Sequence, residues 1–188
     1  MKLDKTKPSQ SFSVASSTSG SNGWYKALSI KTTLSDSQSG VSSSKYCITT
    51  GSSCTPSTAA TLSNNTFTIA LGTNASAQKI CVSTTDVAGN TSDVSCTSAY
   101  KVDKNAPTLT ISSSVFQNNI TVSLATSDAG SGVGTYYYSR DGGKNFTSST
   151  SNSYTFTGLS SGTYSLVSKV LDKAGNMSST SSASQSIA

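Results

Sequence analysis

The chain contains no histidine and no glutamate, and all eight of its acidic residues are aspartates. General acid–base catalysis most often uses histidine or glutamate, and zinc sites use histidine or clustered cysteine. Charged residues make up only 11% of the chain, and Arg140 is its single arginine. The composition therefore argues against an enzyme, and it predicts no catalytic residues and no cofactor.

Long hydrophobic runs are also missing from the sequence. No stretch of 18 or more apolar residues occurs, so we expect no membrane insertion in this segment. The first ten residues are charged and lack the apolar centre of a signal peptide. We therefore expect the export signal and any anchor to lie outside the segment.

The basic residues are scattered along the chain, whereas nucleic-acid-binding proteins usually concentrate them on one face. We expect no nucleic-acid partner. The net charge of +5 has two interpretations. It describes either a mildly basic surface or a weak attraction to anionic cell-wall polymers and glycans.

Serine and threonine make up about 38% of the chain, a polar composition that is also found in disordered segments. Apolar residues still account for 34%, and they fall in short runs that alternate with polar residues. Runs of period two, rich in threonine, valine, isoleucine, tyrosine and phenylalanine, favour half-buried β-strands. No amphipathic helix is evident, so the sequence predicts an all-β fold.

Three sequence signatures occur twice, in the same order. They are Asp4–Ser9 and Asp103–Thr108, Ser35–Val41 and Ser127–Val133, and Asp86–Ser92 and Asp172–Ser178. The offset between the copies falls from 99 to 86 residues, so the loops differ in length. We expect a first domain at 1–102 and a second at 103–188. The charged stretch around residues 101–106 ends at a proline and predicts a short, stiff linker.

Each copy is expected to form six or seven short strands separated by turn residues, which is typical of a β-sandwich. A hairpin turn is expected at 140–143, where two glycines tolerate positive φ. The clearest expected strands are 25–33, 45–49, 67–71 and 79–84 in the first copy, and 107–115, 120–125, 136–139, 154–156 and 164–170 in the second.

The turn signatures are familiar as a set. They are Asn22-Gly23-Trp24-Tyr25, Ser-Asp followed closely by Ser-Gly-Val, Asp-x-Ala-Gly-Asn, and Val-Asp-Lys-x-Ala-Pro at the start of the second copy. Together they resemble the bacterial immunoglobulin-like repeat family over nearly the whole chain. The resemblance implies two tandem immunoglobulin-like β-sandwich domains and carries no catalytic residues.

Members of that family recur as stalk or spacer modules in surface adhesins and as accessory modules in secreted enzymes. The resemblance therefore implies an extracellular or bacterial cell-surface location and a non-catalytic spacer role. The expected partners are neighbouring domains of the same polypeptide. The alternative is a module that binds a glycan or a host surface protein.

Four cysteines, Cys47, Cys54, Cys81 and Cys96, lie in the first copy. An even number in a chain that looks exported favours disulfides, and the absence of a C-x-x-C pair argues against zinc. Facing residues of a hairpin have a constant index sum, and the centres of Cys47–Cys54 and Cys81–Cys96 both fall on turn residues. We therefore predict these two pairs. A Cys47–Cys81 bond between neighbouring strands is the alternative.

Aspartate and asparagine recur at the turns of both copies. Oxygen atoms of Asp86, Asn90 and Asp103 could converge on a calcium ion at the domain junction. Alternatively, these residues only cap turns by accepting hydrogen bonds from nearby backbone N–H groups.

The aromatic residues form two groups, Trp24 with Tyr25 and the run Tyr136, Tyr137 and Tyr138. In the run, alternation places two rings on one face of a strand and one on the other. Exposed rings in one plane could stack on sugars, whereas rings at a loop end more often close the core of a sandwich.

Overall fold

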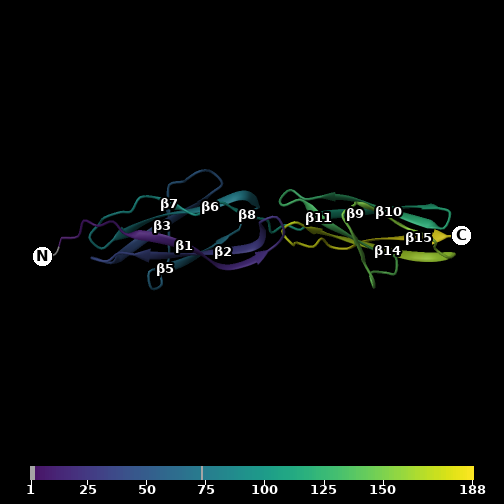
Figure 1. Cartoon of the computed structure of the whole chain (residues 1–188), viewed down its shortest axis with the longest axis horizontal. Helices are drawn as coiled ribbons and strands as arrows, with labels where there is room; N and C mark the ends of the chain where they lie inside the picture. Colours follow the sequence, from purple (N-terminus) through teal and green to yellow (C-terminus); the bar gives the residue numbers. More distant parts are fainter. Residues whose placement is uncertain (1–2, 73) are drawn as a thin grey trace. The chain divides into compact units, whose positions relative to one another are not determined.

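Every regular element in the described part of the chain is a β-strand. The computed structural model describes residues 3–72 and 74–188, which form fifteen strands (Figure 1). The chain divides into two units. Unit 1 contains the residues up to Ser19 and Gly23–Lys104, and unit 2 contains Gly20–Asn22 and Asn105–Ala188. The boundary expected at residue 102 lies two residues before the division at Lys104.

Unit 1 has two sheets linked by one short strand. In the first sheet, β2 (Trp24–Ser35) is central and pairs with β1 (Ser9–Ser19) and β5 (Thr66–Leu71). In the second, β6 (Ala75–Asp86) pairs with β7 (Ser95–Cys96) and with β3 (Val41–Thr49), which pairs with β4 (Thr58–Ala59). The linking strand β8 (Tyr100–Val102) pairs with the start of β2 and the start of β6.

The core of unit 1 follows from strand alternation. In β2, every second side chain from Leu28 to Leu34 is buried, because successive residues of a strand point to opposite faces. Phe67 and Leu71 of β5 and Ile80 and Val82 of β6 meet this row in one hydrophobic cluster. The cluster lies between the two layers, which makes unit 1 a β-sandwich.

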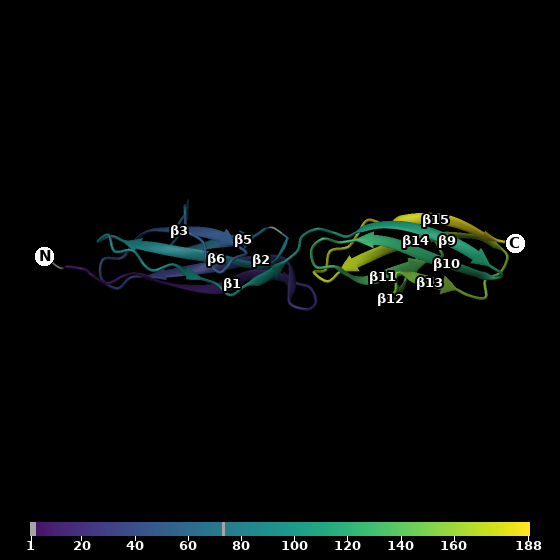
Figure 2. The same ribbon diagram turned by 90° about the horizontal axis from the view of Figure 1, so that it is seen from above.

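Unit 2 repeats this plan with only antiparallel pairs. Its first sheet has the order β13 (Ser153–Phe156), β10 (Asn119–Ser127), β9 (Thr108–Phe116). Its second sheet has the order β12 (Thr147–Ser149), β11 (Val133–Ser139), β14 (Gly162–Asp172), β15 (Ser181–Ile187). Figure 2 shows the strands of this unit from above. Buried residues of β10, β11 and β14 fill the space between the sheets: Ile120, Val122, Leu124, Tyr138, Leu166 and Val170.

Each strand range listed from the sequence overlaps a strand of the structure. The strands that the sequence did not predict are β1, β4, β7, β8 and β12. Strand β1 is the longest of these, and six of its eleven residues are serines in a mostly exposed strand. Its pairing with β2 supplies the order that its own weak apolar pattern does not indicate.

The turn expected at 140–143 is only part of a longer connection. Tyr138 pairs with Thr147, so the loop between β11 and β12 runs through Phe146. Gly142 and Gly143 have φ of 75° and 86°, which explains the two glycines. The loop is longer because Asp141 accepts hydrogen bonds from the backbone N–H groups of Lys144 and Asn145, which folds the chain back three and four residues later.

Candidate functional sites

Two disulfides stabilise unit 1. They join Cys47 to Cys54 and Cys81 to Cys96, the pairs expected from hairpin geometry. Cys81 faces both Cys47 on β3 and Cys96 on β7, so the alternative Cys47–Cys81 bond would also have joined facing residues. Disulfides of this kind are typical of proteins in oxidising compartments.

Three carboxylates from distant parts of unit 1 come together at one end of its sheets. Asp4 precedes β1, Asp36 follows β2, and Asp86 is the last residue of β6. One carboxylate oxygen of each lies within 4.8 Å of the others. Two ligands of one calcium ion, each 2.3–2.6 Å away, can be at most about 5 Å apart, so this spacing fits calcium.

The turns use most of the oxygens in this cluster. Asp86 is only 1% exposed and accepts hydrogen bonds from the backbone N–H of Asn90 at 2.8 Å and its side-chain amide at 2.7 Å. Asp4 accepts hydrogen bonds from the backbone N–H groups of Ser39 and Thr6. A hydrogen bond with the Ser39 side chain, followed by that of the Thr6 backbone, holds the pKa of Asp4 below its usual value.

Asp36 differs from the other two aspartates. Its Oδ1 accepts hydrogen bonds from three successive backbone N–H groups, at 3.2, 2.9 and 2.8 Å. Its Oδ2 is buried and has no hydrogen-bond donor among the described residues. Among residues 3–72 and 74–188, no lysine or arginine forms a salt bridge with any of these three carboxylates. A buried carboxylate oxygen without a partner is costly, and a bound cation would remove that cost.

The structure brings together two of the three calcium candidates named from the sequence. Asp86 and Asn90 do lie together, but Asp103 follows Val102, which pairs with Ala75 at the opposite end of β6. A strand rises about 3.3 Å per residue, so the eleven steps from Ala75 to Asp86 span about 36 Å. Asp4 and Asp36 take the place of Asp103. Their recurrence as Asp103 and Asp128 in the second copy was the signal in the sequence.

Unit 2 repeats the same turn chemistry. Asp172 accepts hydrogen bonds from the backbone N–H and side-chain amide of Asn176, both at 2.7 Å. Asp128 accepts from Gly130 and Gly132 through Oδ1, and its Oδ2 is again buried without a partner. The turn-capping interpretation thus describes part of what these aspartates do in both units, but it leaves one oxygen of Asp36 and one of Asp128 unexplained.

Three of the five aromatic candidates belong to the cores. Tyr25 packs against the core of unit 1, with its ring edge-on to Tyr100 at 6.3 Å. Tyr136 and Tyr138 both pack into the core of unit 2. Trp24 is partly exposed, and Tyr137 lies on the other face of β11, with the Lys169 ammonium 5.6 Å from its ring centre. The five rings therefore do not form one exposed plane.

A pocket of about 250 Å³ lies in unit 2 beside Arg140. It is lined by Arg140, Thr147, Tyr154, Thr155, Phe156 and Thr157. The guanidinium carbon of Arg140 is 5.8 Å from the centre of the Phe156 ring. Sequence reasoning did not select this residue, because a single arginine in a chain of scattered lysines carries no pattern.

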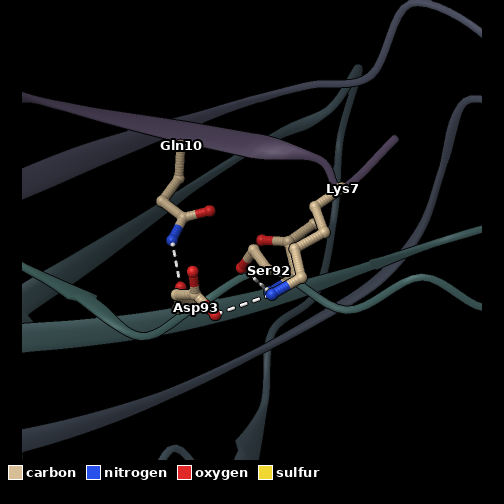
Figure 3. Close-up of polar contacts among 5 residues, drawn as sticks. Lys7, Gln10, Ser92 and Asp93 are labelled. Carbon is tan, nitrogen blue, oxygen red and sulfur yellow. Dashed lines mark hydrogen bonds and ion pairs between the residues drawn. The ribbon is translucent and has the colours of Figure 1, made fainter. Parts of the chain in front are cut away.

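A second cleft, of about 270 Å³, lies where β1 begins. Figure 3 shows the polar contacts of Lys7, Gln10 and Asp93, which line it. The Lys7 ammonium is 2.8 Å from the Asp93 carboxylate, and the Gln10 side-chain amide donates to the Asp93 backbone oxygen. The hydrogen bond and the charge of Lys7 lower the pKa of Asp93. Both charged side chains are largely exposed, so this pair contributes little to stability.

No protein-family model matches the chain, and no curated protein matches it in sequence. Among solved structures, domains A168–A170 of titin are similar to 94% of this chain and 65% of their own, with a TM-score of 0.54 at 12% identity. The fibronectin(III)-like modules of Clostridium thermocellum CbhA match over 94% of both chains (14% identity, TM-score 0.43). The PKD1 domain of the Vibrio cholerae metalloprotease PrtV matches 44% of this chain and 98% of its own (20% identity, TM-score 0.37).

The likeness to titin supports the fold alone. Together with the two cores and paired sheets, it confirms that the chain is all-β, with two immunoglobulin-like sandwich domains in tandem. In the described residues, no helix is long and apolar enough to cross a membrane.

Proposed function

We propose that the chain is a non-catalytic spacer in a secreted or surface-exposed bacterial protein, where it holds another domain of the same polypeptide at a distance. The observation that carries the proposal is the duplication of one complete sandwich, each copy closed around its own core. Modules that fold separately can be added in series and transmit force. The sequence motifs support the bacterial repeat family, and the two disulfides support an oxidising location.

In this proposal, a calcium ion held by Asp4, Asp36 and Asp86 strengthens unit 1. The three ligands come from the segment before β1, the turn after β2 and the end of β6. A shared cation would connect the incoming chain to both sheets, which is where a spacer is pulled. Calcium is favoured because all the available ligand atoms are oxygens.

Single-molecule force spectroscopy tests the proposal on the whole chain. We expect two unfolding events, one for each unit. Reductant should lengthen only the event of unit 1, because it releases loops with sequence separations of 7 and 15. At about 3.4 Å per residue, less the 6.3 and 4.0 Å that the two bonds already span, the added length is about 65 Å.

Calcium chloride, compared with a chelator, should raise the unfolding force of unit 1. Asp36→Asn should remove this effect. Asp93→Asn makes the same charge change at an exposed position outside the cluster, and it should keep the effect. A single unfolding event would refute the proposal of two modules in series. Two events whose unfolding forces do not change with calcium would refute only the proposed calcium site.

A second candidate function is that of a binding module for a glycan or host protein. The aromatic residues predicted for it do not gather on one surface, so they give it little support. The pocket beside Arg140 is the feature that favours it.

A further inference from the structure

We propose that the pocket beside Arg140 binds a sugar residue that carries a carboxylate, as part of an acidic saccharide. This inference goes beyond the spacer role and does not depend on it. It rests on three features of unit 2: the place of the pocket at the sheet edges, the unpaired charge of Arg140, and the polar lining to which three threonines contribute.

The pocket opens where the edges of the two sheets face each other. Thr147 belongs to β12, the edge strand of one sheet, and Tyr154 to Phe156 belong to β13, the edge strand of the other. These strands have only three and four residues, so they offer few backbone groups for pairing with an added peptide strand. A volume of about 250 Å³ is just below the range of typical small-molecule pockets, which suits one sugar residue of a longer chain.

The charge of Arg140 has no carboxylate partner in the described residues. The adjacent carboxylate of Asp141 is engaged elsewhere. It accepts hydrogen bonds from the Ser139 hydroxyl at 2.6 Å and from the Asn145 backbone and side-chain N–H groups at 3.0 and 2.7 Å. These hydrogen bonds, led by that of Ser139, hold the pKa of Asp141 well below its usual value. The planar guanidinium of Arg140 is left to bind a carboxylate through two parallel hydrogen bonds.

The aromatic ring beside the guanidinium is held in place by its neighbours. Phe156 is only 8% exposed, and its ring meets the Tyr154 ring edge-on at 5.0 Å. Tyr154 in turn stacks on the buried Tyr138 at 5.4 Å. The exposed lining of the pocket is mostly polar, so the hydroxyls of a sugar can meet threonine side chains around the guanidinium. Thr147 and Thr157 lie at the rim for this purpose.

The single arginine makes a direct test possible. In a ¹H–¹⁵N spectrum of the whole chain, the Nε–H resonance of Arg140 is unique, and the Trp24 indole provides a unique reference in unit 1. We expect tetragalacturonate to shift the Arg140 resonance saturably and to leave the Trp24 resonance unmoved. Neutral galactotetraose of the same length should produce no shift.

Variants separate this site from general electrostatic attraction. Arg140→Gln should weaken tetragalacturonate binding about tenfold or more, because charge-assisted hydrogen bonds are lost. Arg140→Lys keeps the charge but loses the planar fork, so it should also weaken binding. Lys144→Gln removes one charge from the same loop outside the pocket and should leave the affinity within about twofold.

Three outcomes would overturn the proposal. The first is equal binding of galactotetraose, and the second is equal binding of tetraglutamate or free acetate, which would show recognition of any carboxylate. The third is an equal loss for Lys144→Gln and Arg140→Gln. If Arg140→Gln unfolds unit 2, the shift of the Arg140 resonance in the unmodified chain and the affinity of Arg140→Lys decide the matter.

Discussion

The two disulfides should differ in strength, and unit 2 provides an internal reference for measuring them because all four cysteines lie in unit 1. In the chain-entropy model, a bond that closes a loop of 7 residues contributes about 2.4 kcal/mol, and one that closes 15 residues contributes about 3.0 kcal/mol. Cys81 is fully buried, so replacing it also removes packed sulfur, which costs about 1 kcal/mol more.

The variants Cys47→Ala/Cys54→Ala and Cys81→Ala/Cys96→Ala isolate the two bonds. We expect losses in the free energy of unfolding of unit 1 of about 2.4 and about 4 kcal/mol. For a domain of this size these losses correspond to decreases in Tm of roughly 10–20 °C and 16–32 °C.

The only tryptophan, Trp24, lies in β2 of unit 1, so its fluorescence during urea unfolding reports that unit alone. Far-UV circular dichroism follows both units and should show the transition of unit 2 unchanged. An equal loss for the two pairs, a greater loss for Cys47–Cys54, or a shift of the unit 2 transition would refute this reasoning.

Two further predictions concern unit 2. Asp172→Ala removes the acceptor of two 2.7 Å hydrogen bonds from Asn176, and both residues are only 3% exposed. The free energy of unfolding of unit 2, measured by circular dichroism in urea, should therefore fall by about 2–4 kcal/mol, and a fall below about 1 kcal/mol would contradict this. Burial, followed by the neighbouring Tyr136, raises the pKa of Tyr138 to about 12 from its usual 10. The stability that this shift contributes is fully present below pH 10 and is lost as the pH rises to 12. Between these pH values, the free energy of unfolding of unit 2 should therefore fall more steeply with pH for the unmodified chain than for Tyr138→Phe.

The sequence predicted the features that depend on local pattern. Strands β2 and β10 alternate strictly enough for their buried faces to be assigned without a structure. The disulfide pairs followed because both bonds close short loops around recognisable turns. Strand β1 could not be found in this way, because its serine-rich sequence has little apolar alternation and its order comes from pairing with β2.

The acidic cluster lay beyond local pattern for another reason. Asp4 and Asp86 are 82 residues apart in the sequence, and only the packing of the two sheets against each other brings them to the same end of unit 1. The sequence did show that aspartate recurs at all three positions in the second copy, but not which aspartates of one copy meet. The pocket at Arg140 also depends on two sheet edges that no local pattern places side by side.

The presence of aspartate rather than asparagine at position 36 distinguishes between two roles, capping a turn and binding a cation. Capping the turn needs one acceptor oxygen, and asparagine caps such turns as well as aspartate does. Aspartate adds a charge, and the structure buries the oxygen Oδ2 without a donor beside two other carboxylates. The same choice occurs at Asp128, where Oδ2 is again buried and without a partner. At Asp36 this costly arrangement is what the proposed cation would explain and the turn alone does not.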